Sequence, residues 1–185
     1  MRVSIRGVES GHTNFPHADM LLDRLSPRLV FAAVFLVCAA LMGFGLVLQH
    51  VQNLEPCPMC IMQRVAFIVC AAVALIAALH HPQGIGVRIY GLLVAATALA
   101  GASVAARQSW LQHFPPKIVD CGPDLEFMLG SFSLAEALPL IFRGTGDCSK
   151  VQWTFLGLSI AEWSLVWFVT IAVVGIYLLL RKRNS

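Results

Sequence analysis

The sequence predicts an all-α integral membrane protein, built as a four-transmembrane-helix bundle. Of its 185 residues, 58% are hydrophobic and only 12% are charged, and the mean hydropathy is +0.76. These values are too apolar for a soluble domain of this length. Four runs are long enough to cross roughly 30 Å of hydrocarbon as helices, and the only charge in them is Arg64. They are residues 29–48, 61–79, 89–106 and 163–180, within a single membrane domain over 29–180.

The basic residues predict how the bundle is oriented. An even number of spans puts both termini on one side, together with the short connection between the second and third spans. That side carries eight of the thirteen Lys and Arg residues, namely Arg2, Arg6, Arg24, Arg28, Arg88, Arg181, Lys182 and Arg183. Lys and Arg gather on the cytoplasmic side of membrane proteins. We therefore expect cytoplasmic tails at 1–28 and 181–185 and outward loops at 49–60 and 107–162. The net charge of +3 reflects this asymmetry and does not indicate nucleic-acid binding.

The first span follows a polar stretch that we interpret as a disordered tail. A cleaved signal peptide is the alternative, but its apolar region is usually about 7–15 residues, shorter than the run over 29–48. Cys38 in this span and Cys70 in the next are expected to be small packing residues. The third span is rich in Gly and Ala, which permits close approach of a neighbouring helix.

The segment EPCPMCIMQR at the start of the second span carries the chemistry. Cys57 and Cys60 form a C-x-x-C pair, and Pro58 suits the first turn of a helix, so the helix should begin at about Pro58. Cys60 then lies near the positive end of the helix dipole and is a candidate for a reactive thiolate. Arg64 lies one turn further on, where it could stabilise that thiolate or an oxygen of the molecule that reacts with it.

Other uses of the cysteine pair were weighed against this interpretation. A c-type haem site needs a histidine directly after the second cysteine, and Ile61 excludes it. A structural zinc site would need two more ligands, which Cys121 and Cys148 could supply, although without the usual paired spacing. Inert buried cysteines are a third possibility, but thiols flanked by proline at a helix start are poorly placed as core filler.

The long loop over 107–162 holds two further outward cysteines. Cys121 lies among Pro and Gly residues, so it is expected on irregular, accessible backbone, and a short membrane-surface helix is expected over 134–142. Four outward cysteines in an oxidising compartment fit two disulfides with three possible connectivities. Of these, we expect Cys57–Cys60 with Cys121–Cys148 at rest. A C-x-x-C bond closes too small a loop to stabilise a fold much, which favours a redox role.

Several of these motifs together resemble a known family. The segments PCPMC followed by I-x-x-R, the Gln49-His50 pair, WLQHFPP before Cys121, and GDCSKVQWTFLGL around Cys148 are similar to those of bacterial DsbB proteins. The resemblance covers roughly residues 30–180. It implies an enzyme of the bacterial inner membrane that reoxidises a periplasmic thioredoxin-like dithiol protein, DsbA. The two electrons would pass to membrane quinone, either ubiquinone or menaquinone.

The resemblance also implies a role for each cysteine. The partner thiolate would attack Cys121 and release Cys148, which would then attack Cys57. Cys60 would be left as a thiolate beside the quinone, with Arg64 polarising a quinone oxygen. One departure concerns Gln108, which occupies the position where some members carry a histidine thought to assist quinone binding. The nearby His113 cannot be given that role from the sequence.

Three rival functions remain at this point. Vitamin K epoxide reductases also combine a membrane C-x-x-C with loop cysteines, but their C-x-x-C tends to lie late in the chain, whereas here it opens the second helix. A non-enzymatic membrane protein could hold zinc or copper on the four outward cysteines. A structural subunit could carry static disulfides.

Overall fold

The computed structural model describes residues 26–54, 56–115 and 146–181. Four long helices dominate these ranges: α2 (Pro27–Gln52), α3 (Pro58–His80), α4 (Ile85–His113) and α8 (Ile160–Leu180). Each is long and apolar enough to cross a membrane, and each contains one of the four spans expected from the sequence. The predicted four-helix class is confirmed. The surface helix expected over 134–142 lies outside the described residues.

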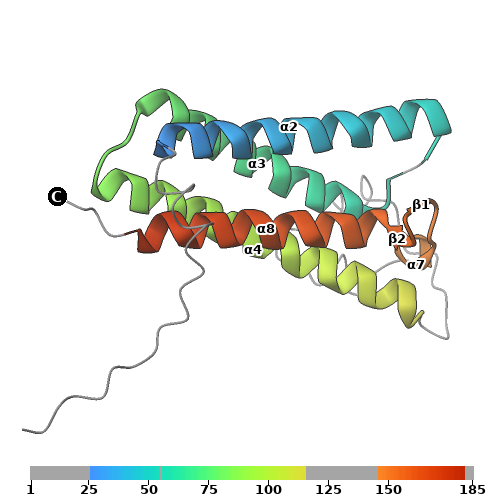
Figure 1. Cartoon of the computed structure of the whole chain (residues 1–185). Coiled ribbons are helices and arrows are strands. Elements are labelled where there is room, and N and C mark those ends of the chain that lie inside the picture. The colour runs from blue at the N-terminus through green and yellow to red at the C-terminus, as the bar shows by residue number, and fades with distance from the viewer. Residues whose placement is uncertain (1–25, 55, 116–145, 182–185) are drawn as a thin grey trace, which may run out of the picture.

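The four helices run side by side, and the small elements gather at one end of the bundle (Figure 1). The short helix α7 (Gly146–Ser149) and the strands β1 (Thr154–Phe155) and β2 (Leu158–Ser159) lie at the end where α2 joins α3. The α3–α4 connection and the C-terminal end of α8 lie at the opposite end. The segments that carry Cys57 and Cys148 therefore meet at the same end of the bundle.

The start of α3 has the capping arrangement that its sequence indicates. The helix begins at Pro58, as expected, because proline lacks the N–H that a first-turn residue would leave unpaired. Cys57 is the N-cap residue, and its sulfur accepts a hydrogen bond from the Cys60 backbone N–H at 3.4 Å. A cysteine sulfur thus occupies the position where a serine or aspartate oxygen is usual.

The start of α8 is fixed by a hairpin and a capping box that we did not predict. β1 and β2 pair antiparallel around Leu156 and Gly157, whose φ angles are +53° and +82°. Positive φ at both central residues is what a two-residue hairpin turn of type I′ requires. Ser159 then caps α8: its Oγ accepts from the Glu162 N–H, and its own N–H donates to the Glu162 carboxylate at 2.7 Å.

Helices α4 and α8 cross at very short range, as the small residues of the third span predicted. A Cβ added at Gly175 would lie 2.8 Å from the Ala95 backbone nitrogen and 2.9 Å from the Gly91 carbonyl oxygen. Phe168 sits over Gly101 and stacks on Phe67 of α3 at 4.0 Å between ring centroids. Glycine therefore allows two backbones to touch at the crossing point.

We expect Gly175→Ala to lower the stability of the bundle by about 1–3 kcal/mol, because its methyl group would meet backbone atoms that cannot move individually. Gly43→Ala in α2 is the matched control, since a Cβ there meets nothing within 4 Å. Thermal unfolding of both variants in detergent checks the prediction. Equal unfolding midpoints would show that the crossing tolerates a larger separation.

Cys38 and Cys70 are packing residues, as expected. Both are fully buried in the main apolar core, which contains residues of all four long helices. Neither lines the cavity described below.

Candidate functional site

Cys57 and Cys60 lie together at the N-terminal end of α3. Their sulfur atoms are 2.9 Å apart, with the Cys57 thiol donating a hydrogen bond to the Cys60 sulfur. Cys57 is buried and Cys60 is partly exposed, and both residues line a cavity. Both are free thiols in this structure, so the disulfide expected between them stays a prediction.

Cys148 joins this pair from the segment between α4 and α8. It lies on α7, is fully buried, and packs in a small apolar cluster with Cys57, Met59 and Val104. The Cys57 thiol hydrogen-bonds with the side chain of Cys148. Three of the four predicted site cysteines therefore meet, and the approach of Cys148 to Cys57 that the resemblance implied is present. Cys121, and with it the expected bond to Cys148, lies outside the described residues.

The environment of Cys57 favours its protonated form. The hydrogen bond with Cys148, the hydrogen bond with Cys60 and burial all raise the pKa of the Cys57 thiol far above its ordinary value. The proton of the pair therefore stays on Cys57. Negative charge is directed to Cys60, the less buried of the two cysteines that line the cavity.

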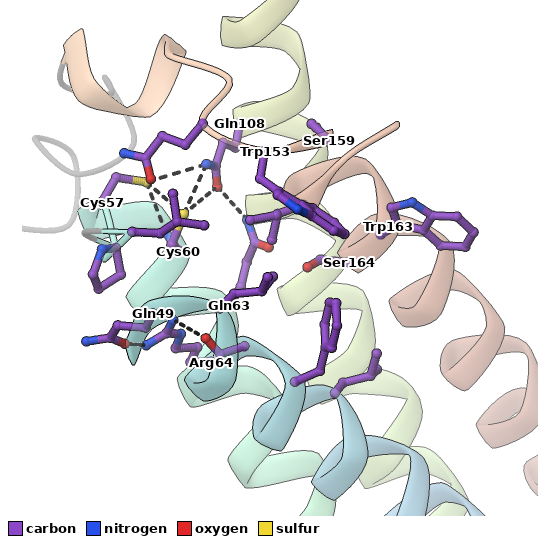
Figure 2. A pocket seen from close by; sticks show the side chains of 18 of the residues that line it. Gln49, Cys57, Cys60, Gln63, Arg64, Gln108, Trp153, Ser159, Trp163 and Ser164 are labelled. Atoms are coloured by element: carbon purple, nitrogen blue, oxygen red, sulfur yellow. Dashed lines mark hydrogen bonds between the residues drawn. The ribbon is translucent and has the colours of Figure 1, made fainter. Parts of the chain in front are cut away.

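Gln108 of α4 contacts both sulfur atoms, a role that sequence reasoning did not assign. Its Nε2 lies 3.2 Å from the Cys60 sulfur and 3.4 Å from the Cys57 sulfur. Its Oε1 accepts a 2.7 Å hydrogen bond from Nε2 of Gln63 on α3. Figure 2 shows the two carboxamides meeting beside the cysteine pair. Only 4% of either glutamine is exposed, so these are buried polar contacts between two packed helices.

Arg64 lies one turn after Cys60, and its side chain is held by α2. Its Nη1 donates to Oε1 of Gln49 at 2.5 Å, and its Nη2 donates to the Gly45 carbonyl at 3.4 Å (Figure 2). Within the described residues its hydrogen bonds thus go to α2 rather than to the Cys60 sulfur. The guanidinium still borders the cavity, where it can meet the oxygen of a ligand.

A cavity of about 500 Å³ opens beside the cysteine pair. Its wall is mostly apolar and aromatic, and its polar side chains include Arg64 and five glutamines. The apolar lining includes Leu41, Met42, Phe44, Leu48, Phe67, Trp153, Phe155, Trp163 and Trp167, and the glutamines are Gln49, Gln63, Gln108, Gln112 and Gln152. Such a pocket suits a largely apolar molecule with a few hydrogen-bonding atoms.

The hairpin forms one aromatic side of this cavity. Trp153 stacks on Phe155 at 5.9 Å between ring centroids, and it meets Phe44 of α2 edge-on at 5.8 Å. The Trp163 indole N–H donates to the Phe155 carbonyl at 3.0 Å, which ties the hairpin to α8. The indoles of Trp153 and Trp163 are therefore part of the cavity wall.

His113 belongs to a separate surface contact. Its side chain is 61% exposed, and its Nε2 lies 3.6 Å from the Glu162 carboxylate. It is not among the residues that line the cavity. The neighbouring Gln112 does line it and accepts a 2.7 Å hydrogen bond from Ser159 Oγ. Among the polar residues of this stretch of α4, Gln108 and Gln112 face the cavity and His113 does not.

Comparison with known proteins places this geometry in a family. The family model described as "Disulfide bond formation protein DsbB" matches residues 27–178. The chain belongs to the DsbB family. It is 60% identical over 156 residues to the disulfide bond formation protein B of Azoarcus sp., covering 84% of this chain and 94% of that one. The protein of the same name from Hahella chejuensis is 46% identical over 159 residues, covering 85% and 96%.

Membership of the DsbB family confirms the resemblance drawn from the cysteine motifs. It agrees with the four membrane-spanning helices, and the family name denotes disulfide bond formation. Both relatives are matched over nearly their whole length, so the chain contains the full family domain.

Proposed function

We propose that this DsbB-family protein reoxidises a DsbA-like periplasmic dithiol protein and passes the two electrons to membrane quinone. One observation carries the proposal. Cys57, Cys60 and Cys148 meet at one end of an apolar cavity that also presents an arginine. Thiol exchange needs sulfurs in contact, and quinone reduction needs an apolar site beside the last sulfur.

The thiol chemistry proceeds by successive exchanges within the chain. A partner thiolate attacks Cys121 of a Cys121–Cys148 disulfide, which forms a mixed disulfide with Cys121 and releases Cys148 as a thiolate. The partner's second thiol then attacks the mixed disulfide, which closes the partner's own disulfide and releases Cys121 as a thiolate. Cys148 attacks Cys57 of the Cys57–Cys60 disulfide and displaces Cys60 as a thiolate. Cys121 then attacks Cys148, which regenerates the outer disulfide. Two electrons and two protons are thereby transferred to the Cys57–Cys60 pair, and the partner leaves oxidised.

The residues around the cavity fit a quinone. The aromatic and aliphatic lining suits a ring and an isoprenoid tail, and Arg64 with the carboxamides of Gln63 and Gln112 offers donors to carbonyl oxygens. When bound, a quinone supplies an acceptor for two electrons and two protons. The chain contributes the Cys60 sulfur at the cavity wall and a positive charge on α3 that favours negative charge on an oxygen.

The proposal includes a location and an orientation. We propose the bacterial inner membrane, with both termini in the cytoplasm and the cysteine end of the bundle in the periplasm. The distribution of Lys and Arg supports this orientation. The cysteine segments also lie at the end opposite the C-terminus, so a periplasmic partner could reach them (Figure 1).

The test is quinone reduction by the purified protein in detergent, driven by a reduced DsbA-like protein and followed with ubiquinone and with menaquinone. Wild type should turn over, and Cys121→Ala should not. We expect Arg64→Ala to raise the KM for quinone by about tenfold or more, because a hydrogen bond to a charged group contributes about 1.5–3 kcal/mol. Arg88→Ala, an exposed arginine at the other end of the bundle, is the control.

Two results would contradict the proposal. Absence of quinone reduction by wild type with each quinone would remove the proposed acceptor, and stoichiometric zinc or copper with reduced thiols would indicate a metal-binding protein instead. An unchanged KM in Arg64→Ala would remove Arg64 from the quinone contacts while leaving the thiol chemistry intact.

A further inference from the structure

The carboxamide of Gln108 is buried against the sulfur atoms of Cys57 and Cys60. Its orientation decides whether these sulfur atoms contact its NH₂ group or its carbonyl oxygen. A carboxamide has a donor end and an acceptor end of nearly the same size. Turned one way, Gln108 offers N–H groups to the cysteines and stabilises a thiolate. Turned the other way, Gln108 offers its carbonyl oxygen to the cysteines, and this oxygen would repel a thiolate. With 4% of the residue exposed, water has little access to this contact.

Gln63 is placed to select between these two orientations. Its Nε2 donates to Gln108 Oε1 at 2.7 Å, which draws the oxygen toward α3 and leaves Nε2 of Gln108 facing the cysteines. The Cys60 sulfur lies 3.2 Å from that nitrogen and 3.7 Å from the oxygen, so the nearer contact is the donor. The reverse orientation would place the donating NH₂ groups of Gln63 and Gln108 against each other.

We propose that Gln63 and Gln108 form a carboxamide clamp in which Gln63 directs the NH₂ group of Gln108 onto the Cys60 sulfur and so holds negative charge there. Gln108 acts on the reacting sulfur itself. Gln63 is a positioning residue, because its effect on the sulfur passes through Gln108.

The clamp accounts for the asymmetry of the cysteine pair. Cys57 receives the longer Gln108 contact, at 3.4 Å, and donates its own proton to Cys60. Cys60 therefore accepts hydrogen bonds from both Cys57 and Gln108. A carboxamide donor carries no titratable proton in the physiological range, so its support for the thiolate should not vary with pH.

Other ionisable groups surround the same sulfur, and the test must hold them constant. They are the thiols of Cys57 and Cys148 and, among the cavity-lining residues, Arg64 and Lys150. None of them is altered in the variants chosen below, so their influence is common to every sample.

The clamp contributes to turnover only if Cys60 delivers electrons, as proposed above, but the reactivity of its thiolate can be measured without any quinone. The reduced full-length protein is pulsed with iodoacetamide across a pH series, and alkylation of Cys60 is quantified by mass spectrometry of its peptide. Methionine replaces glutamine because it is similar in length, unbranched and cannot donate. The variants are Gln108→Met, Gln63→Met and the double variant, with Gln112→Met as matched control on the same helix and the same cavity.

We expect Gln108→Met to move the midpoint of the Cys60 profile upward by about one pH unit, a tenfold loss of thiolate below the midpoint. Gln63→Met should move it in the same direction by less, and the double variant should match Gln108→Met alone, because Gln63 acts only through Gln108. Gln112→Met should leave the profile unchanged.

Three outcomes would overturn the clamp: an unchanged profile in Gln108→Met, an equal shift in Gln112→Met, or shifts from Gln63 and Gln108 that add. Each of them can occur while wild type still reduces quinone, so failure of the clamp is distinguishable from failure of the proposed function. If Gln108→Met does not fold, Gln63→Met against Gln112→Met decides the question, since the clamp requires a shift in the first only.

Discussion

Replacing Cys148 with serine is expected to abolish quinone reduction driven by the partner protein, with a loss on the order of 10³-fold or more, the scale typical of losing a covalent nucleophile. Cys148 is fully buried against Cys57, and in the proposed cycle it is the sulfur that passes electrons from the Cys121–Cys148 pair to the Cys57–Cys60 pair. Serine keeps the size of the side chain but cannot exchange with a disulfide. Partner-driven turnover of purified Cys148→Ser protein in detergent measures the effect.

A small dithiol supplies the internal control for this variant. Dithiothreitol is small enough to reduce the inner pair through the cavity that Cys60 borders, so Cys148→Ser should still reduce quinone with dithiothreitol within a few-fold of wild type. Cys70→Ala is the matched cysteine control, since Cys70 is equally buried but lies in the main core away from the site. If Cys148→Ser retained partner-driven turnover, electrons would have to reach Cys57 by another route.

The helical framework and the start of α3 could be predicted because their causes are local. Apolar runs longer than the bilayer thickness fix the four spans, and the proline at position 58 fixes where α3 begins. The spacing from Cys60 to Arg64 is one helical turn, which puts both residues on the side of α3 that lines the cavity. Features of this kind depend on residues that are close to one another in the sequence, so the sequence alone predicts them.

The missed features depend on contacts between distant segments. Gln63 and Gln108 are separated by 45 residues, and no local pattern shows that one donates to the other. The meeting of Cys148 with Cys57 was implied by the family resemblance rather than by the residues themselves, and the burial of Cys148 was not predicted. Two signals could have been found locally: the S-x-x-E capping box at Ser159, and the glycine of the turn that closes the β1–β2 hairpin.

Replacing Cys60 with serine is expected to stop quinone reduction and to trap a disulfide between Cys57 and Cys148. In the proposed cycle Cys60 is the thiolate that leaves when Cys148 attacks Cys57. Cys60 is also the group that could attack the resulting Cys57–Cys148 disulfide and reverse the step. Without it, Cys57 and Cys148 remain as two thiols in hydrogen-bond contact. A mild oxidant such as diamide removes two electrons and two protons from them and joins them.

The trapping experiment discriminates between the two sulfurs of the pair. It is best done with Cys121→Ser in every sample, so that Cys148 has no outer partner, and the linkage is read by mass spectrometry of a non-reducing digest. Cys60→Ser should give the Cys57–Cys148 link nearly stoichiometrically. Cys57→Ser should give little Cys60–Cys148 link, because Cys148 hydrogen-bonds with Cys57, whereas Cys60 only packs against the edge of the cluster that contains Cys148. Equal yields from both variants would mean that Cys148 reaches either sulfur, and the order of electron transfer would then not be set by this packing.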